Sequence, residues 1–317
     1  MSIDALVDGQ CDDTTAPTPP LPARDPRGHK GTFGTVVVVG GSIQGSRVML
    51  GGALIAARSA LRAGAGLVQL AVPEPLALAA LSALESATGR ALPVDTDGHL
   101  DPSGCAAVLD EALADAHALA IGPALGGGAA VEQVVVRTLA NARMPIVIDA
   151  DALNALARTA QFDRDIGAAG LILTPHPGEY ARLAAALHIE PAAADDDASR
   201  EMGARSLAQR LGCIAIVKGP RTAVSDGIHT WSARAGTAAL ATGGAGDALA
   251  GIVASFVAQF HARGPGLSLF DCARLGVAVH GLAARRWSGV HGDAGLLASE
   301  ICEMIPDTLA ALRTAPS

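Results

Sequence analysis

The sequence contains almost no lysine and few aromatic residues. Lysine occurs only at Lys30 and Lys218, aromatic residues make up 3% of the 317 residues, and the formal net charge at pH 7 is −8. Proteins that bind nucleic acids usually carry a basic face, and those that bind single strands add stacking aromatic side chains. The composition therefore argues against a nucleic-acid-binding protein. It leaves a small anionic ligand open, because backbone dipoles can bind phosphate in an acidic protein.

Cysteine pairs and long apolar runs are also missing. The five cysteines include no Cys-x-x-Cys pair, which fits neither a disulfide framework nor a zinc site and predicts reduced, mostly buried thiols. The longest apolar stretches, such as 248–260, are shorter than the roughly 18 residues of a membrane helix. The N-terminus lacks the basic and apolar regions of a secretory signal and carries four early aspartates. We therefore expect a cytoplasmic protein without a membrane partner.

Apolar residues make up half of the chain, which is enough to bury a large aliphatic core. The Pro-rich residues 1–27 have no apolar period, and we expect them to form an extended or disordered tail. No second Pro-, Gly- or Ser-rich linker follows. We therefore expect one domain at residues 28–317.

Short apolar segments alternate with helical segments along this domain. Strands without polar alternation are buried on both faces, so the pattern predicts a layered α/β fold with a mostly parallel central sheet flanked by helices. Strands are expected at 35–39, 67–72, 117–121, 145–149, 171–174, 213–218, 222–225 and 228–231, and helices at 48–63, from 151, from 246, and near 268–287 and 296–304. Ligands of such sheets bind at the carboxyl ends of the strands, where this chain carries its unusual residues.

The sharpest local feature is the sequence Thr-Gly-Gly-Ala-Gly-Asp at 242–247, which precedes an apolar helix. Glycines let the backbone approach a ligand, and the helix start adds free N–H groups and the positive end of its dipole. Together they favour an anion site for a transferring phosphoryl group. Asp247 is a candidate helix cap, metal ligand or general base. A Gly-rich turn capped by Asp explains the motif equally well, and the Gly-Lys-Ser/Thr of a Walker loop is missing.

A second constellation is Thr-Pro-His-Pro-Gly-Glu at 174–179. Two prolines restrict the backbone around His176, so the loop presents an imidazole at a strand end with little entropy to lose. A simple strand-to-helix turn explains Pro177 at the first helical position and Glu179 near the dipole. That simpler interpretation does not explain His176.

Two further strand ends carry charge. The segment 149–154 begins with Asp149, a candidate for contacts with Mg²⁺-bound water or a hydroxyl, and continues with Asp151, which we interpret as a helix N-cap. The segment 218–222 joins two predicted strands, and its Lys218 or Arg221 can meet nucleotide phosphates. The alternative is a hairpin turn with solvated charges. The rarity of lysine gives Lys218 additional weight.

Taken in order, these motifs resemble the ADP- or ATP-dependent NAD(P)H-hydrate dehydratases of the ribokinase-like superfamily. The resemblance extends from about Lys30 to Leu309. The matching segments are 30–34, 40–42, 60–68, 149–154, 174–179, 218–219, 241–252 and 295–299. The family implies a ribokinase-like fold and metabolite repair, in which a nucleotide phosphorylates the hydroxyl of NADHX or NADPHX and phosphate then leaves, restoring NADH or NADPH.

The resemblance also implies roles for individual residues. Asp247 becomes the general base, and a Mg²⁺ ion accompanies ADP or ATP, with ADP preferred as in bacterial members. Residues expected to bind the substrate are Gly52, Ala124, His176, Asp247, Asp149 and Asn154. Residues expected to bind the nucleotide are Lys218, Gly219, Pro220, Arg221, Thr222, Gly243, Gly244, Ala245 and Gly246. Glu179 is expected to contact the metal through water.

The sequence departs from the family pattern at several positions. Thr237 and Ala238 replace the usual Asn-Pro, and Ala124 stands where the family has a substrate-contacting glycine. The epimerase domain often fused ahead of this one is missing, so we expect any epimerase to be a separate protein. Homologues often form symmetric oligomers, which predicts a homo-oligomer. Two other functions stay open: a ribokinase-like kinase for a vitamin precursor or sugar, and an inactive nucleotide-binding sensor.

Overall fold

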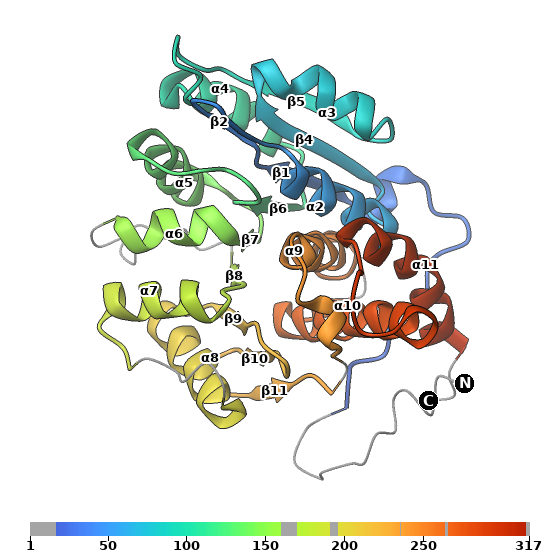
Figure 1. Cartoon of the computed structure of the whole chain (residues 1–317). Helices are drawn as coiled ribbons and strands as arrows, with labels where there is room; N and C mark the ends of the chain where they lie inside the picture. The colour runs from blue at the N-terminus through green and yellow to red at the C-terminus, as the bar shows by residue number, and fades with distance from the viewer. Residues whose placement is uncertain (1–16, 160–169, 191–195, 235, 264–265, 315–317) are drawn as a thin grey trace.

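The computed structural model describes residues 17–159, 170–190, 196–234, 236–263 and 266–314. A nine-stranded sheet forms its centre (Figure 1). In spatial order the strands are β11 (Thr230–Ser232), β10 (Ala223–Ser225), β9 (Ile214–Val217), β8 (Leu171–Leu173), β7 (Ile146–Ile148), β6 (Ala118–Ile121), β1 (Thr35–Val39), β4 (Leu67–Pro73) and β5 (Thr88–Leu92). Pairing is parallel from β9 to β5, and β10 and β11 are antiparallel. The predicted α/β class and mostly parallel sheet are confirmed.

Helices cover both faces of the sheet (Figure 1). Successive side chains of β1 point to opposite faces of the sheet, so the sheet divides the core into two layers. Val36 and Val38 pack into one apolar layer, and Val37 and Val39 pack into the other. The first layer contains residues of α2 (Gly51–Arg62), α9 (Ala245–Phe256), α10 (Leu269–His291) and α11 (Ala298–Thr314), with Ala80 of α3 (Ala77–Ala83). The second contains residues of α4 (Pro102–Leu113), α5 (Ala129–Asn141), α6 (Ala150–Arg158), α7 (Pro177–Leu187) and α8 (Asp197–Leu211). Short helical turns are η1 (Lys30–Phe33), η2 (Glu74–Leu76), η4 (Ala238–Leu240) and the π-helical η5 (Val257–His261).

The predicted start of the helix at 48–63 and the N-cap assignment of Asp151 are wrong. The expected helix at 48–63 begins only at Gly51, because Arg47–Met49 forms β3 and pairs with β2 (Ser42–Gln44) as a small separate hairpin. Helix α6 begins at Ala150, so Asp149 and not Asp151 occupies the N-cap position. The Asp151 carboxylate instead accepts a hydrogen bond from the Gly126 backbone N–H at 2.8 Å. Asp151 therefore braces the loop after β6.

The described part of the Pro-rich segment, residues 17–27, contains no helix or strand. Arg24 fixes part of it to the domain, because its guanidinium donates to the Gly64 carbonyl and to Gln259 and lies 3.4 Å from the centre of the Phe33 ring. Leu21 packs against the first core layer. Residues 1–16 lie outside the described residues.

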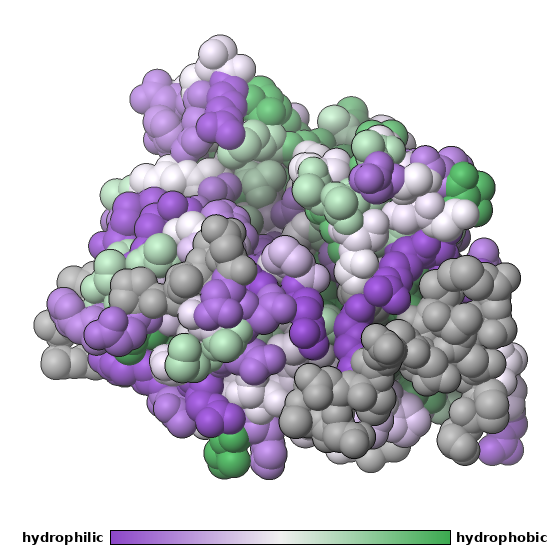
Figure 2. Space-filling model, turned by 60° about the horizontal axis from the view of Figure 1, so that its bottom comes forward, coloured by the Kyte–Doolittle hydropathy of each residue, from purple (hydrophilic) through white to green (hydrophobic). Residues whose placement is uncertain are grey.

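Few large apolar side chains are exposed among the residues that the structure describes. The large exposed ones are Val48, Leu78, Met202, Ile228, Val290 and Leu297. The face in Figure 2 is mostly hydrophilic, with hydrophobic colour confined to small separate areas. Within the described ranges, no helix is both long and apolar enough to cross a membrane. Cys105, Cys213, Cys272 and Cys302 are buried free thiols, as predicted, and Cys11 lies outside the described residues.

Candidate active site

Three carboxylates and one lysine meet near the carboxyl ends of β7 and β9. Asp149 follows β7 and Lys218 follows β9, while Glu179 and Asp247 lie in the first turns of α7 and α9. Lys218 Nζ is 2.7 Å from Asp149 Oδ1 and 3.8 Å from Glu179 Oε2. Its side chain is only 18% exposed. The alternative of a solvated hairpin charge is therefore wrong for Lys218.

Burial and mutual repulsion shift the proton affinities of these groups. Burial, reinforced by Asp149, raises the pKa of Asp247 to about 7. Burial likewise raises the pKa of Glu179 to about 7, although Lys218 opposes the shift. Burial lowers the Lys218 pKa, but Asp149 and Glu179 outweigh it, so the net pKa is raised and the ammonium stays charged. The cluster thus holds one permanent cation beside two carboxyl groups that titrate near neutral pH.

Asp247 is the carboxylate of this cluster that lacks a bonded partner. Thr174 Oγ1 donates to Asp149 Oδ1 at 2.7 Å, and the His176 backbone N–H donates to Glu179 Oε2 at 2.8 Å. Asp247 makes no hydrogen bond to any residue that the structure describes. A carboxylate that titrates near pH 7 and is free to accept a proton has the properties of a general base.

The Gly-rich loop leaves room for a ligand around Asp247. Gly244 has a φ of 89°, which favours glycine, and precedes α9 as its N-cap without a side-chain cap. A Cβ on Gly243 would meet nothing within 4 Å, whereas one on Gly246 would lie 3.0 Å from Lys218 Nζ. A Cβ on Gly52 would lie 3.0 Å from the Asp247 carboxylate. The structure therefore brings Gly52, the loop and the lysine together around Asp247.

His176 is a helix cap, which the sequence did not predict. Its Nδ1 accepts from the backbone N–H groups of Gly178 and Glu179, at 2.9 and 3.4 Å, in a capping box with Glu179. Burial, together with Lys218 and Arg182, lowers the pKa of His176. The neutral ring therefore carries its proton on Nε2, which lies 3.4 Å from Glu179 Oε1. The strand-to-helix turn thus accounts for His176, and the half-exposed ring is also presented at the site.

A cavity of about 610 Å³ adjoins this cluster. It is bounded on one side by the segment after β9 and on the other by α9, α10 and η4. Its lining includes six residues expected at the nucleotide site and also His176: Lys218, Gly219, Pro220, Thr222, Ala245 and Gly246. Thr237 and Ala238, which depart from the family pattern, line it as well. Gly243, Gly244 and Arg221 are not part of this lining, and Arg221 lies 3.7 Å from Asp197 across the surface.

His280 is a cavity residue that the sequence analysis did not single out. The side chain is 9% exposed, and its Nε2–H donates to the Ala245 carbonyl at 2.9 Å. Burial lowers the pKa of His280 to about 4, so the ring is neutral and Nδ1 is an acceptor. Nδ1 has no partner among the described residues. His280 reaches the cavity because α10 packs against the start of α9. No local sequence signal indicates this contact.

Two expected substrate residues lie beside the cluster and not in it. Ala124 lies in the loop after β6 with a φ of 57°, a conformation that is costly for alanine, and its carbonyl accepts from Ser42 Oγ. Asn154 Oδ1 accepts from Arg182 Nε at 2.8 Å and links α6 to α7. The Asn154 side chain is therefore already engaged in a structural contact.

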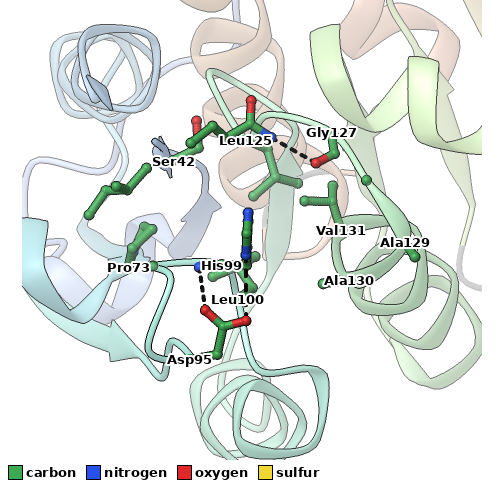
Figure 3. Close-up of a pocket in the computed structure, with 14 residues that line it drawn as sticks. Ser42, Pro73, Asp95, His99, Leu100, Leu125, Gly127, Ala129, Ala130 and Val131 are labelled. Atoms are coloured by element: carbon green, nitrogen blue, oxygen red, sulfur yellow. Dashed lines mark hydrogen bonds and ion pairs between the residues drawn. The ribbon is translucent and has the colours of Figure 1, made fainter. Parts of the chain in front are cut away.

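A second cavity, of about 300 Å³, lies beyond Ala124 at the ends of β1, β4 and β6 (Figure 3). Its lining includes Ser42, Gln44, His99, Leu125 and Val131. The imidazole of His99 stands edge-on in the middle of this cavity in Figure 3.

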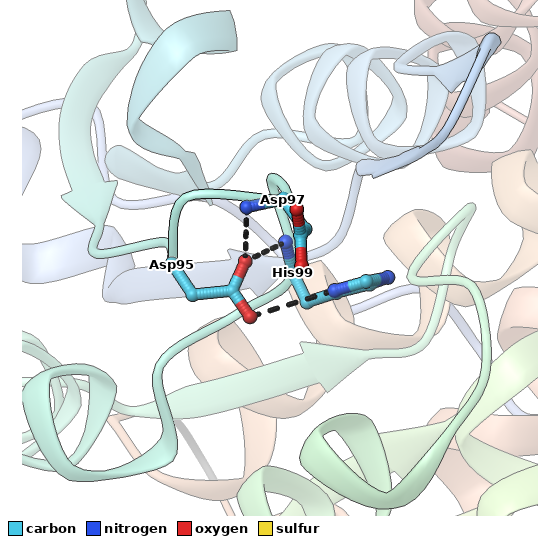
Figure 4. Close-up of side chains that lie close together, drawn as sticks. All are labelled: Asp95, Asp97 and His99. Carbon is cyan, nitrogen blue, oxygen red and sulfur yellow. Dashed lines mark hydrogen bonds and ion pairs between the residues drawn. The ribbon is translucent and has the colours of Figure 1, made fainter.

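Among the described residues, one group of three metal-capable side chains lies close enough together to share an ion, namely Asp95, Asp97 and His99 (Figure 4). All three are exposed. Asp95 Oδ1 already accepts the backbone N–H groups of Asp97 and His99 at 2.9 Å each. The group is a turn closed by an aspartate side chain, and its contacts are explained without a metal.

The chain is similar to known proteins over most of its length. Residues 36–307 match a family described as NAD(P)H-hydrate dehydratase. The chain is 35% identical over 286 residues to the bifunctional NAD(P)H-hydrate repair enzyme of Salinibacter ruber, covering 90% of the chain and 50% of that enzyme. It is also 35% identical to the ADP-dependent (S)-NAD(P)H-hydrate dehydratase of Lactiplantibacillus plantarum, covering 74% of the chain and 75% of that protein.

Solved structures extend the comparison to the fold. The ADP/ATP-dependent NAD(P)H-hydrate dehydratase of Bacillus subtilis, co-crystallised with ATP and Mg²⁺, superposes with a TM-score of 0.71 at 28% identity, covering 92% of this chain and 95% of that one. A ribokinase-like protein of Enterococcus faecalis superposes with a TM-score of 0.73 at 23% identity, over 92% of both chains. The chain spans about half the length of the repair enzymes that it matches.

Proposed function

The chain belongs to the NAD(P)H-hydrate dehydratase family, and on that premise we propose that it converts (6S)-NADHX or NADPHX to NADH or NADPH with a nucleotide as phosphoryl donor. The observation that carries the proposal is the position of Asp247. Its unbonded carboxylate, with a pKa of about 7, lies between Gly52 and the Gly-rich start of α9. A base beside an anion-binding helix start is what phosphorylation of a hydroxyl requires.

In the proposed reaction, Asp247 takes the proton of the ring hydroxyl as its oxygen attacks the terminal phosphorus of the nucleotide. The bond from phosphorus to the leaving nucleotide then breaks. Backbone N–H groups of Gly243 to Gly246 and the Lys218 ammonium stabilise charge on the transferring group. Phosphate subsequently leaves the ring carbon, assisted by the lone pair of the ring nitrogen, and a proton leaves the neighbouring carbon. Phosphorylation thus replaces hydroxide by a far better leaving group.

The carboxylates of the site fit a Mg²⁺ ion held mainly through the nucleotide. Asp149 and Glu179 both contact Lys218, and no group of three ligands that includes either one lies close together in the described chain. Mg²⁺ keeps several waters and is commonly bound through one or two carboxylates and substrate phosphates. Asp149 or Glu179 would hold it through water, and the ion would neutralise phosphate charge.

The 610 Å³ cavity suits the donor nucleotide. Its walls combine apolar Leu249 and Val277 with the Lys218 ammonium and the neutral His280. The relatives named for ADP or ATP support the same cofactor.

We expect another domain or protein, outside the matched residues 36–307, to epimerise the substrate. We also expect a homo-oligomer, and light scattering of the purified protein would measure its mass.

The test is to incubate the purified protein with NADHX, Mg²⁺ and either ADP or ATP, and to follow the return of NADH absorbance. Nucleotide-dependent recovery supports the proposal and identifies the preferred donor. Accumulation of a stable phosphorylated product without NADH would instead indicate a kinase. Binding without turnover would indicate a sensor.

A further inference from the structure

Arg200 is a buried cation beside the segment 218–222, which is expected to bind the nucleotide. It lies in the first turn of α8, and its side chain is only 2% exposed. The other buried residues of this helix are small or apolar: Gly203, Ala204, Leu207 and Ala208. Burying a guanidinium costs desolvation free energy that an apolar side chain in the same place would avoid. The contacts of Arg200 therefore point to a role other than core packing.

Arg200 contacts the middle of this segment from behind, since it does not itself line the cavity that the segment borders. Its Nε donates to the Arg221 carbonyl at 3.3 Å. A Cβ on Gly219 would lie 2.7 Å from both Cδ and Nε of Arg200, closer than non-bonded atoms pack. Gly219 does not have a positive φ, so the close approach of Arg200, and not the backbone conformation, favours glycine here.

Other backbone contacts fix the two ends of the segment. The Lys218 N–H donates to the Pro175 carbonyl at 2.9 Å, and the Ala233 N–H donates to the Thr222 carbonyl at 2.9 Å. Between these ends, the Gly219 N–H has no hydrogen-bond partner within the described ranges, and Gly219 lines the cavity. An N–H in this position, next to the Lys218 ammonium, is available to an anionic ligand.

Asp197 orients the Arg200 guanidinium from the start of α8. Arg200 Nη2 donates to Asp197 Oδ1, and Nη1 of Arg221 lies 3.7 Å from Asp197 Oδ2. The planar guanidinium can bond Asp197 and the Arg221 carbonyl at the same time, because its donors point in different fixed directions. A lysine at this position would keep the charge beside Asp197 but lose the bond that Nε makes to the segment.

We propose that Arg200 is a positioning residue for the donor nucleotide, which holds the backbone of the segment between Gly219 and Arg221 in the conformation that binds it. The proposal rests on the proposed function, because it assumes that this segment binds ADP or ATP. Arg200 acts through the segment and does not itself touch the nucleotide.

The effect of Arg200→Lys on the two KM values tests the proposal. The variant should raise KM for ADP or ATP at least about tenfold and change KM for NADHX less than about threefold, because only the nucleotide segment loses its support. A purely structural role would instead lower the amount of active protein and leave both KM values unchanged. Equal rises in both KM values, or an unchanged nucleotide KM, would contradict the proposal.

Arg205→Lys is the matched control. Arg205 is an exposed arginine of the same helix, and its Nε donates to Thr230 Oγ1 on β11 and not to the segment 218–222. This variant should change neither KM by more than about twofold, because exposed side-chain contacts contribute little. A nucleotide KM that rises as much in Arg205→Lys as in Arg200→Lys would overturn the assignment to Arg200.

Folding and the proposed function are tested separately. Thermal melting followed by circular dichroism shows whether Arg200→Lys folds, and Arg200→Met, which buries no charge, replaces it if it does not, with the same expected difference between the KM values. Titration calorimetry with ADP and with ATP measures binding without turnover, and the variant should bind at least about tenfold more weakly. If the wild type binds a nucleotide but does not convert NADHX, the proposed function fails, and the calorimetry still tests Arg200. If the wild type and the variant bind the nucleotide equally, only the role of Arg200 fails.

Discussion

Lys218 Nζ lies 2.7 Å from Asp149 Oδ1 and joins the carboxyl ends of β9 and β7. The ion pair engages one carboxylate of the cluster, and Glu179 is engaged by the start of its own helix. Asp247 remains as the carboxylate without a bonded partner among the described residues. This difference between the three carboxylates supports the proposal that Asp247 is the base, with Asp149 and Glu179 as charged groups beside it.

Asp247→Asn should lower kcat by about 10²-fold or more, because it removes the proposed general base. It should also stabilise the fold at pH 8. Burial raises the folded-state pKa of Asp247 to about 7, above its usual value of 3.8, so ionisation costs stability as pH rises between these values. The melting temperature of Asp247→Asn should exceed that of the wild type at pH 8 and approach it at pH 4. A destabilised variant at pH 8 would contradict this account.

The pH profile of kcat/KM should have an acidic limb near pH 7, with activity lost as Asp247 becomes protonated. Asp151 contributes to the raised pKa of Asp247. Asp151→Asn keeps an oxygen that can accept from Gly126 but removes the charge, so the limb should move to lower pH. Initial rates measured between pH 5 and 9 give the profile of the wild type and that of Asp151→Asn. A limb at the same or higher pH in Asp151→Asn would argue against Asp247 as the titrating group.

His280→Phe should raise KM for the nucleotide by about tenfold, the effect of roughly 1.4 kcal/mol, because it removes the bond to Ala245 and a cavity acceptor. His280→Gln retains an amide donor and should recover part of the affinity. KM for the hydrated dinucleotide should stay nearly constant in both variants. Steady-state kinetics with each substrate varied in turn measure this, and equal effects on both KM values would indicate a general structural role.

Ala124→Gly should stabilise the protein by up to about 1 kcal/mol, because the φ of 57° strains alanine but not glycine. This corresponds to roughly 2 °C in melting temperature. Ala152→Gly, in the buried face of α6, is the matched control and should destabilise by about 1 kcal/mol. Differential scanning calorimetry measures the melting temperatures of both variants and of the wild type. A lower melting temperature in Ala124→Gly would show that the methyl group contributes packing that outweighs the strain.

The sequence was sufficient to predict the sheet and the edge at which the site lies. Short buried strands such as Thr35–Val39 and Ile146–Ile148 are almost entirely apolar, and the parallel arrangement follows from the helices between them. The glycines before Asp247 had two equally good local explanations, an anion site and a capped turn, and the sequence alone did not decide between them. The strand-end rule singled out Asp149 and Lys218, and the structure pairs these two side chains at 2.7 Å.

The sequence was insufficient where function depends on long-range contact. Nothing local indicates that His280 on α10 faces Ala245 on α9, because the contact depends on helix packing across 35 positions. The first residues of the helix expected at 48–63 instead belong to strand β3 of a hairpin, because Val48 and Met49 suit either a helix or a short strand. The cap role of His176 was missed because imidazole is an uncommon N-cap residue.

The central claim is that the ring hydroxyl is phosphorylated before it leaves, and oxygen labelling tests it most directly. NADHX prepared by hydration in H₂¹⁸O carries the label in this hydroxyl. The protein, Mg²⁺ and ADP or ATP then convert it, and mass spectrometry measures the label in the released inorganic phosphate. We predict ¹⁸O in the phosphate, in proportion to the NADH formed. Unlabelled phosphate, with the ¹⁸O recovered in water, would contradict the account.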